Sequence, residues 1–290
     1  MSRRHLRPRR KKPRPRPRPK PRPEPQAKPM RKDTFALIVG IEYTGYAQRG
    51  TLDRLPGCHA DANSMQHILR TRFGVADFNI LSDSGPAYTQ PTKANICNAL
   101  KHFAQISSKY KHMILYYSGH GTQVRDSSGD EADHHDECVV PCDFLSAGHI
   151  TDDYLLKNVL RHIDADTKCT LITDCCNSGT LFDLKFQYVG NGNMKPLNKQ
   201  SIAVKADIIT LSGCKDPQTS ASAYNLQRKR SWRGAMTYAM ETTLSKHNYK
   251  CSWQTLLGGV HAYLTKNNFS QKPQVCSSSL RSLANTAFLF

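Results

Sequence analysis

Short apolar segments alternate with amphipathic segments from residue 33 to the C-terminus, and this alternation is the feature that most constrains the fold. Six short apolar segments predict buried strands: 35–41, 78–81, 113–117, 169–173, 207–211 and 287–290. Five longer amphipathic segments predict helices: 60–72, 93–106, 153–163, 235–245 and 253–266. Near-continuous apolar strands separated by helices indicate an α/β fold with a mostly parallel central β-sheet and helices on both faces.

The first 32 residues have a composition of their own. They hold 15 of the 41 lysines and arginines and 9 of the 16 prolines, so residues 33–290 carry only +4 of the total net charge of +18. Such a segment repels itself and has almost nothing apolar to bury, which predicts a disordered arm. It suits an anionic partner (nucleic acid, a membrane surface or an acidic protein) or, equally, a removable prosegment.

Targeting signals and cysteine usage indicate the compartment. No apolar signal-peptide core follows the basic start, and no run of about 18 apolar residues occurs. We therefore expect a cytoplasmic protein without a transmembrane segment. The basic arm could give this protein access to the nucleus. Ten scattered cysteines then indicate buried thiols rather than a disulfide framework. Zinc is disfavoured, because no second Cys/His pair at zinc-finger spacing accompanies Cys138 and Cys142.

The chain after the arm divides at one polar stretch. The sequence QYVGNGNMKPLNK, residues 187–199, is rich in Gly and Asn, which predicts an exposed loop. We therefore expect one domain over 33–290, made of a larger part (33–186), a loop (187–205) and a smaller part (206–290).

Two predicted strands end in residues suited to catalysis, and in parallel sheets functional residues gather at the carboxyl ends of strands. In MILYYSGHGTQ, residues 113–123, His120 stands between glycines that leave its ring unobstructed. In LITDCCNSGT, residues 171–180, two adjacent cysteines stand beside small residues, where a sulfur can be exposed. A lone histidine is more often structural, but a neighbouring strand would bring this imidazole to a thiol, as a cysteine nucleophile requires.

The spacing and the flanking motifs lead to a family resemblance. His120 precedes Cys176 by 56 residues, close to the roughly 50 of caspases. Eight blocks, in order and spacing, resemble the metacaspases, caspase-like cysteine peptidases of clan CD (peptidase family C14). These blocks cover essentially all of 34–290: LPGCHADA (55–62), YSGHGTQ (117–123), DECVVPCDF (136–144), ITDDYL (150–155), TDCCNSGT (173–180), LSGCKDPQTSAS (211–222), RGAMTYA (233–239) and QKPQVCSSS (271–279). The resemblance implies a caspase-like fold, and the Pro-rich, prodomain-like arm resembles the type I architecture.

The resemblance also implies the catalytic residues. The family dyad falls on His120 as general base and Cys176 as nucleophile, because the family motif reads Asp, a small residue, then the catalytic Cys. Cys175 occupies the small-residue position, and we expect it to be buried and inert. The oxyanion donors of the family correspond to the backbone N–H groups of Gly121 and Cys176.

A pocket for Arg or Lys must present carboxylates, because a desolvated cation is costly unless it is paired. The metacaspase pocket positions correspond to Asp61 and Asp174, with Cys58 and Ser118 lining the pocket. By itself Asp61 better suits a helix cap, since it stands at the start of a helical segment. The resemblance favours the pocket.

A cluster of acidic residues has no obvious counter-charge: Asp126, Asp130, Glu131, Asp133, Asp136, Asp143, Asp152, Asp153 and Asp183. Solvated loop charges account for most of them, but converging carboxylates repel one another unless a hard cation binds, and Ca2+ takes about six to eight oxygens. The metacaspase calcium positions correspond to Asp136, Asp152, Asp153 and Asp183. The resemblance therefore implies activation by Ca2+ at about millimolar affinity.

Together with these residues, the resemblance implies a calcium-stimulated cysteine endopeptidase, made as a zymogen, that cleaves protein or peptide substrates after Arg or Lys. Its own basic residues make self-processing possible, at Lys195, Lys199, RKR 228–230 or the arm. Asn177 replaces the usual family His, and we expect this to tune the activity rather than to abolish it. Ser222 replaces a family acid, which puts substrate affinity in question more than chemistry. The alternative is a catalytically weak homologue that binds partners through its arm. A caspase proper is disfavoured because cleavage after Asp needs a basic pocket, and the resemblance suggests a monomer.

Overall fold

The computed structural model describes residues 29–47, 54–125, 135–175, 181–182, 184–189, 193–196, 204–213, 222–224 and 232–290. Most of the predicted arm lies outside these residues, as do the predicted nucleophile Cys176 and the predicted calcium ligand Asp183.

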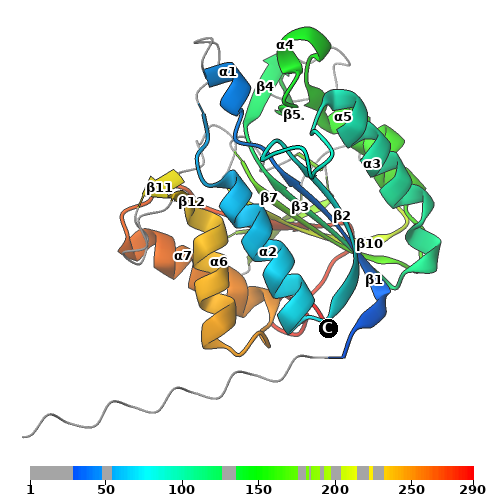
Figure 1. Ribbon diagram of the computed structural model, residues 1–290. Helices are drawn as coiled ribbons and strands as arrows, with labels where there is room; N and C mark the ends of the chain where they lie inside the picture. The colour runs from blue at the N-terminus through cyan, green and yellow to red at the C-terminus, as the bar shows by residue number, and fades with distance from the viewer. Residues whose placement is uncertain are drawn as a thin grey trace, which may run out of the picture.

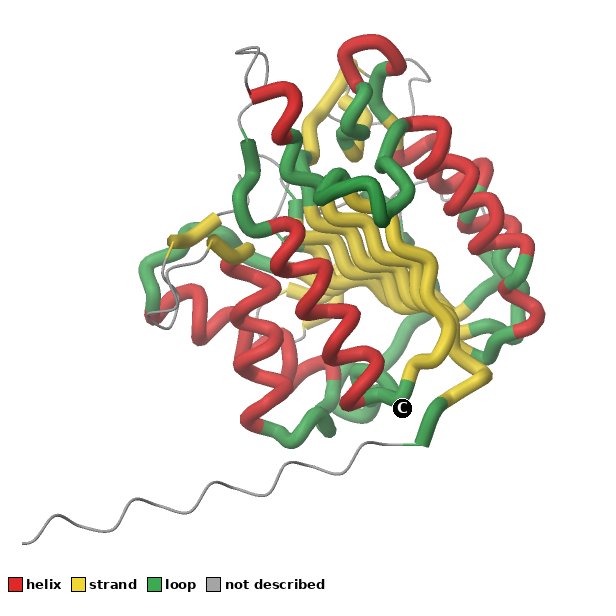
Figure 2. Tube along the Cα trace, viewed as in Figure 1, coloured by secondary structure: helices red, strands yellow, loops and turns green. Residues whose placement is uncertain are grey.

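An eight-stranded sheet forms the centre of the protein, in the order β2-β1-β3-β7-β10-β13-β8-β9 (Figures 1 and 2). The strands are β1 (Arg31–Gly40), β2 (Val75–Ser82), β3 (His112–Ser118), β7 (Lys168–Asp174), β8 (Phe186–Val189), β9 (Asn193–Pro196), β10 (Asp207–Ser212) and β13 (Gln274–Ser277). The pairs from β2 to β10 are parallel, and those from β10 to β9 are antiparallel. The predicted α/β fold is confirmed, with a sheet that is parallel through its middle and mixed at one edge.

Helices cover both faces of this sheet (Figure 1). Helices α3 (Lys93–Gln105) and α5 (Asp152–Asn158) cover one face, whereas α2 (Cys58–Arg72), α6 (Ala235–Lys246) and α7 (Trp253–Lys266) cover the other. Successive strand residues point to opposite faces, so Leu37 packs into the core beneath α3 and Ile38 into the core beneath α2 and α6. Each face of the sheet therefore has its own apolar core.

Two small sheets and several short helices complete the fold. A three-stranded sheet consists of β4 (Gly121–Arg125), β5 (His135–Val139) and β6 (Ile150–Thr151), and a two-stranded sheet consists of β11 (Ser222–Tyr224) and β12 (Trp232–Gly234). The remaining helices are short: α1 (Thr44–Ala47), α4 (Phe144–Ala147), and the 3-10 turns Ser107–Lys109 and Leu160–His162. None of the helices in the described part of the chain is long and apolar enough to span a membrane.

Helix starts follow ordinary capping chemistry in three cases. The hydroxyls of Thr92, Thr151 and Ser252 each accept a hydrogen bond from a backbone N–H in the first turn of α3, α5 and α7. The predicted helix 153–163 is in fact α5 followed by a 3-10 turn, because the helix ends at Asn158.

Two of the sequence predictions were wrong. The predicted strand 287–290 forms only an isolated bridge between Ser252 and Ala287, and β13 fills the sheet instead. Strand β13 escaped prediction because its four residues, QVCS, contain only one strongly apolar side chain. The predicted loop 187–205 contains most of β8 and all of β9, which pair as a hairpin. The Gly and Asn residues between them are typical of a hairpin connection rather than of a long loop.

Candidate active site

The predicted catalytic residues follow two neighbouring strands of the sheet. Strands β3 and β7 run parallel, and their last residues, Ser118 and Asp174, form a register pair. His120 and Cys176 each stand two positions beyond this pair in the sequence, so the chain reaches both from the same carboxyl edge. Cys175 is buried, with 1% of its surface exposed, whereas Cys176 lies outside the described residues.

Two buried tyrosines hold the backbone of His120. The His120 N–H donates to Tyr43 Oη at 2.9 Å, and the His120 carbonyl accepts from Tyr117 Oη at 2.7 Å. Tyr43 Oη donates in turn to the Val140 carbonyl at 2.6 Å. The centroids of the Tyr43 ring and the imidazole are 4.8 Å apart. The half-buried histidine is therefore fixed from both sides of its main chain and along one side of its ring.

Gly119 makes room for this arrangement. A Cβ atom at Gly119 would lie 2.7 Å from Tyr117 Oη and 3.0 Å from Tyr43 Oη, closer than side chains tolerate. The sequence prediction was that a glycine here leaves the histidine unobstructed. In the structure, that glycine also allows two hydroxyl groups to approach the backbone of His120.

Tyr43 adopts an unusual backbone conformation that a nearby carboxylate supports. Its φ is 57°, a left-handed value that is rare for an aromatic residue. Asp83 accepts from the N–H groups of Glu42 at 2.9 Å and Tyr43 at 2.8 Å, and His59 Nε2 lies 2.5 Å from Asp83 Oδ1. Burial by itself would raise the pKa of Asp83, but the hydrogen bonds from His59 and the Glu42 N–H outweigh it and lower that pKa.

The four predicted pocket residues come together from three elements. Helix α2 begins at Cys58 and carries Asp61 in its first turn, while Ser118 and Asp174 end β3 and β7. All four are buried, with at most 6% of any of them exposed. Burial raises the pKa of the Cys58 thiol well above its usual value; a hydrogen bond from Ser118 opposes this rise, and the Asp61 and Asp174 carboxylates add to it.

Asp61 binds the chain segment that precedes α6. Its Oδ1 accepts from Arg233 Nε at 2.6 Å, and its Oδ2 accepts from the Gly234 N–H at 2.6 Å. The N-cap of α2 is Gly57, and among the described residues no side-chain hydrogen bond caps that helix start. Asp61 is therefore not the helix cap that its sequence position alone suggested.

Arg233 bridges two carboxylates. Besides Asp61, its guanidinium contacts Glu241 of α6, with Nη2 2.5 Å from Glu241 Oε1. Burial by itself would lower the pKa of Arg233, but the Asp61 and Glu241 carboxylates outweigh this effect and raise it. Arg233 therefore stays charged and links α2, β12 and α6.

Asp174 lies at the N-terminus of α6. Its Oδ2 accepts from the Thr237 N–H at 3.0 Å and from Thr237 Oγ1 at 2.7 Å. The hydroxyl groups of Thr237 and Tyr116 are 2.7 Å apart. A helix N-terminus favours a negative charge, so α6 helps to stabilise this carboxylate.

Gly234 is the point where the two pocket carboxylates meet. A Cβ atom there would lie 2.4 Å from Asp174 Oδ2 and 2.7 Å from Asp61 Oδ2. The convergence has an electrostatic consequence: burial raises the pKa of Asp61 to about 8, the Arg233 guanidinium acts against that rise, and Asp174 adds to it. The pair suits a cationic side chain, because a cation would relieve both burial and mutual repulsion.

The predicted calcium residues are in part close to one another. Asp136 lies in β5, and Asp152 starts α5; both are buried. Asp152 Oδ2 accepts from the N–H of Glu137 at 3.0 Å, which places Asp152 beside β5. Burial raises the pKa of the Cys138 thiol to about 12, and Asp152, Asp136 and Glu137 add to the rise. Buried carboxylates in contact with one short strand are a donor set that suits a hard cation.

Two other acidic candidates are only partly buried. Asp153 forms an ion pair with Lys157 at 2.8 Å, and Asp143 accepts from the Lys93 N–H at 2.7 Å, which makes Asp143 a structural residue. Asp183 lies outside the described residues. Within the described ranges, no three or more His, Cys, Asp or Glu side chains are grouped so that they could hold a metal ion.

Four residues with close contacts at this site escaped the sequence reasoning: Tyr43, Tyr117, Thr237 and Arg233. Arg233 and Thr237 belong to the RGAMTYA block, and the need of two buried acids for donors could have singled them out. Tyr43 gave no comparable signal, because it stands 77 residues before His120 and meets it only through strand pairing.

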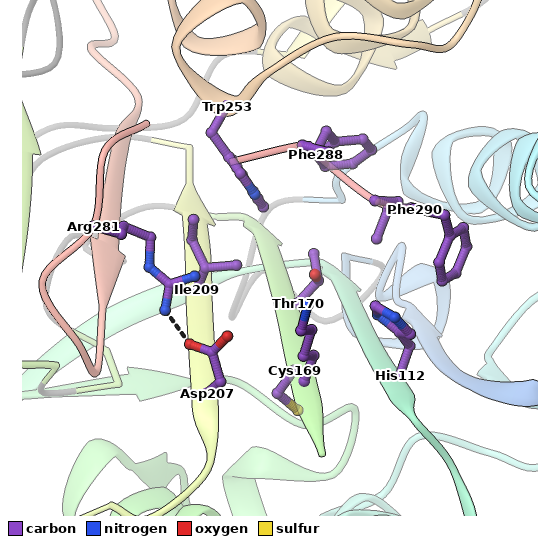
Figure 3. A pocket seen from close by; sticks show the side chains of 12 residues that line it. His112, Cys169, Thr170, Asp207, Ile209, Trp253, Arg281, Phe288 and Phe290 are labelled. Carbon is purple, nitrogen blue, oxygen red and sulfur yellow. Dashed lines mark hydrogen bonds and ion pairs between the residues drawn. The ribbon is translucent and has the colours of Figure 1, made fainter. Parts of the chain in front are cut away.

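A separate cavity of about 200 Å³ lies at the opposite end of the central strands (Figure 3). It lies at the amino ends of β3, β7 and β10, where His112, Lys168 and Asp207 are the first residues. In it, Arg281 forms an ion pair with Asp207. The predicted catalytic residues belong to the carboxyl ends of the same strands, so this cavity is distinct from the candidate active site.

Comparisons with known proteins agree with the sequence motifs. Metacaspase-1 of Cryptococcus neoformans is 32% identical over 292 residues, which cover 84% of this chain and 62% of that protein. Metacaspase-1 of Ajellomyces capsulatus is 33% identical over 304 residues, which cover 88% of this chain and 82% of that protein. A crystal structure of a Geobacter sulfurreducens protein has the same fold, with a TM-score of 0.62 at 24% identity over 89% of this chain and 98% of that one.

The chain thus spans less than two thirds of the Cryptococcus relative. The family model of the metacaspase, peptidase C14 domain, matches residues 35–185, slightly more than half of the chain. That range holds most of β1, all of β3 and β7, and every predicted catalytic and pocket residue. The chain therefore belongs to the metacaspase family of peptidases.

Proposed function

We propose that this chain is a cysteine endopeptidase that cleaves proteins or peptides after Arg or Lys, with His120 as general base and Cys176 as nucleophile. The observation that carries the proposal is the convergence of the buried Asp61 and Asp174 carboxylates on Gly234. A pair of buried carboxylates at the carboxyl ends of the strands would form a binding site for a cation, and His120 follows the same ends.

The proposed reaction uses groups of this chain and one water molecule. His120 takes the proton of the Cys176 thiol, and the thiolate attacks the carbonyl carbon of the scissile bond. The backbone N–H groups of Gly121 and Cys176 would stabilise the oxyanion. The protonated His120 then gives its proton to the leaving amine, and water, deprotonated by the same imidazole, releases the acyl group from the sulfur. Tyr43 and Tyr117 support this sequence by fixing the backbone of His120.

Calcium stimulation and self-processing complete the proposal. Asp136 and Asp152 would hold Ca2+, together with Asp153 and Asp183, and the ion would neutralise their charge. The buried positions of Asp136 and Asp152 beside β5 support this assignment. For Asp153 to take part, it would have to leave Lys157. An enzyme with this selectivity could also cut its own basic segments, such as Lys195, which lies in the exposed strand β9.

The basic arm and the state of the protein in the cell belong to the proposal as well. We infer that residues 1–32 contact an anionic partner and that the protein acts as a cytoplasmic monomer. The charge of the arm supports the first inference.

A peptide assay tests the proposed function. Fluorogenic peptides that differ only in Arg, Lys or Asp before the scissile bond are incubated with the protein, with Ca2+ and with a chelator. We expect hydrolysis after Arg and Lys, only with Ca2+, and none after Asp. Cys176→Ala and His120→Ala should abolish it, and the matched Cys175→Ala should not. Activity that survives in Cys176→Ala would refute the assignment of the nucleophile.

A further inference from the structure

The site that we assign to a substrate cation already contains a cation of this chain. Arg233 Nε lies 2.6 Å from Asp61 Oδ1, and the Arg233 side chain is 16% exposed. Asp61 is completely buried, and a buried carboxylate is costly unless it is paired. Arg233 therefore performs, without substrate, the electrostatic role that a substrate Arg or Lys would perform at Asp61.

The second partner of Arg233 gives this cation another place to bind. Glu241 Oε1 lies 2.5 Å from Nη2, and its side chain is 17% exposed. The ring of Tyr238 lies 5.8 Å from the guanidinium carbon. Because one guanidinium presents several donors in a fixed fork, Arg233 can release Asp61 and keep its contact with Glu241.

We propose that Arg233 is a specificity-determining residue that competes with the Arg or Lys of the substrate for Asp61. This inference rests on the proposed function, because it requires that Asp61 receive a substrate cation. In this arrangement the substrate must displace Arg233 from Asp61 toward Glu241. Arg233 thereby weakens the binding of every basic substrate and selects for sequences whose other contacts compensate.

Kinetics of two variants with opposite expected effects test the proposal. Two peptides are compared that differ only in Arg or its neutral isostere citrulline before the scissile bond. Arg233→Gln should lower KM for the Arg peptide by up to about fivefold, the size of one partly exposed charge pair, with kcat nearly unchanged. Glu241→Gln should raise that KM, because Asp61 is then the carboxylate partner that remains to Arg233 among the described residues. KM for the citrulline peptide should change in neither variant.

Other outcomes would overturn the proposal. If Arg233→Gln raises KM for the Arg peptide, Arg233 positions Asp61 rather than competing for it; an unchanged KM excludes both roles. If Arg233→Gln fails to fold, Glu241→Gln decides the question, and an unchanged or lower KM in that variant refutes competition. The matched control is Arg281→Gln, which removes an arginine of similar exposure from the Asp207 ion pair at the opposite edge of the sheet and should leave KM unchanged (Figure 3).

A binding measurement separates this inference from the proposed function. Agmatine, a free guanidinium compound, is titrated calorimetrically into the wild-type protein and into Arg233→Gln. Tighter binding to the variant, in a protein that cleaves no peptide, would retain the role of Arg233 and reject the proposed peptidase activity. Cleavage after Arg without tighter agmatine binding to the variant would retain the proposed peptidase activity and reject the role of Arg233.

Discussion

Tyr43 Oη lies 2.9 Å from the backbone nitrogen of His120. The two residues are distant in sequence, but β1 and β3 are neighbouring parallel strands, so their carboxyl ends lie side by side. Asp83, just after β2, holds the strained backbone of Tyr43 by accepting its N–H at 2.8 Å. Three adjacent strands thus contribute to the position of one proposed catalytic residue.

Replacing Tyr43 with Phe should weaken this support. The variant leaves the His120 N–H without its acceptor, and an unsatisfied buried donor costs about 1–3 kcal/mol, so the free energy of unfolding should fall by that amount. A misplaced base should lower kcat by about tenfold without a large change in KM. Urea unfolding measures the free energy of unfolding, and peptide kinetics measure kcat and KM. The control is Tyr110→Phe, which removes an exposed hydroxyl that donates to Asp77; a kcat loss of similar size there would contradict the argument.

A methyl group at Gly234 should disturb the pocket specifically. Gly234 has φ −62° and ψ 130°, which alanine adopts readily, so any effect of Gly234→Ala comes from contact with the carboxylates of Asp61 and Asp174. We expect a loss of stability of about 1–3 kcal/mol from overpacking, together with a higher KM for Arg peptides.

The matched control for that variant is Gly258→Ala in α7. A Cβ atom at Gly258 has no other atom within 4 Å apart from its own helix and chain neighbours, and alanine in a helix is about 0.5–1 kcal/mol more favourable than glycine. Gly258→Ala should therefore stabilise the protein and leave KM unchanged. If both alanine variants behave alike in thermal unfolding and kinetics, the convergence on Gly234 is not important for binding.

The central strands and the helices could be predicted because their signals are local. The apolar run before His120 and the periodic segment after Cys58 agree with β3 and α2 to within about two residues. Strand β13 could not be predicted, because four residues with little apolar character join the sheet only through pairing with β10 and β8. The terminal 287–290 segment shows the converse error, since Phe288 and Leu289 are buried in the core without forming a strand, while Ala287 and Phe290 are exposed.

The two acidic residues of the pocket could be predicted from the sequence, but the residues that bind them were not. Asp61 and Asp174 stand in motifs, and the resemblance assigned them together. Arg233 reaches Asp61 across 172 positions of sequence, and that contact depends on how β12 packs against α2. The RGAMTYA block marks Arg233 as part of a family motif, but only the need of the two buried acids for donors could have separated it from a solvated surface charge.

The raised pKa of Asp61 predicts how selectivity depends on pH. Only the ionised carboxylate attracts a cation, and the ionised fraction rises as pH increases through about 8, the pKa of the buried side chain. The ratio of kcat/KM for an Arg peptide to kcat/KM for its citrulline analogue should therefore rise between pH 7 and pH 9, within about one unit of that pKa. The ratio cancels the titration of His120 and Cys176, which acts on both peptides. Asp61→Asn should give a lower and flat ratio, and a wild-type ratio that does not change with pH would contradict the prediction.

Removal of one buried carboxylate should abolish the response to calcium. Ca2+ at ten times its dissociation constant should raise the free energy of unfolding by about 1.4 kcal/mol, because it binds only the folded protein. Asp152→Asn should lose this increase and the stimulation of peptide cleavage, since Asp152 lies buried beside β5. The control, Asp166→Asn, changes an exposed carboxylate and should keep both responses. Each variant is unfolded with Ca2+ and with a chelator, so that any loss of stability from the substitution itself cancels. Equal calcium shifts in Asp152→Asn and the wild type would place the calcium response elsewhere in the chain.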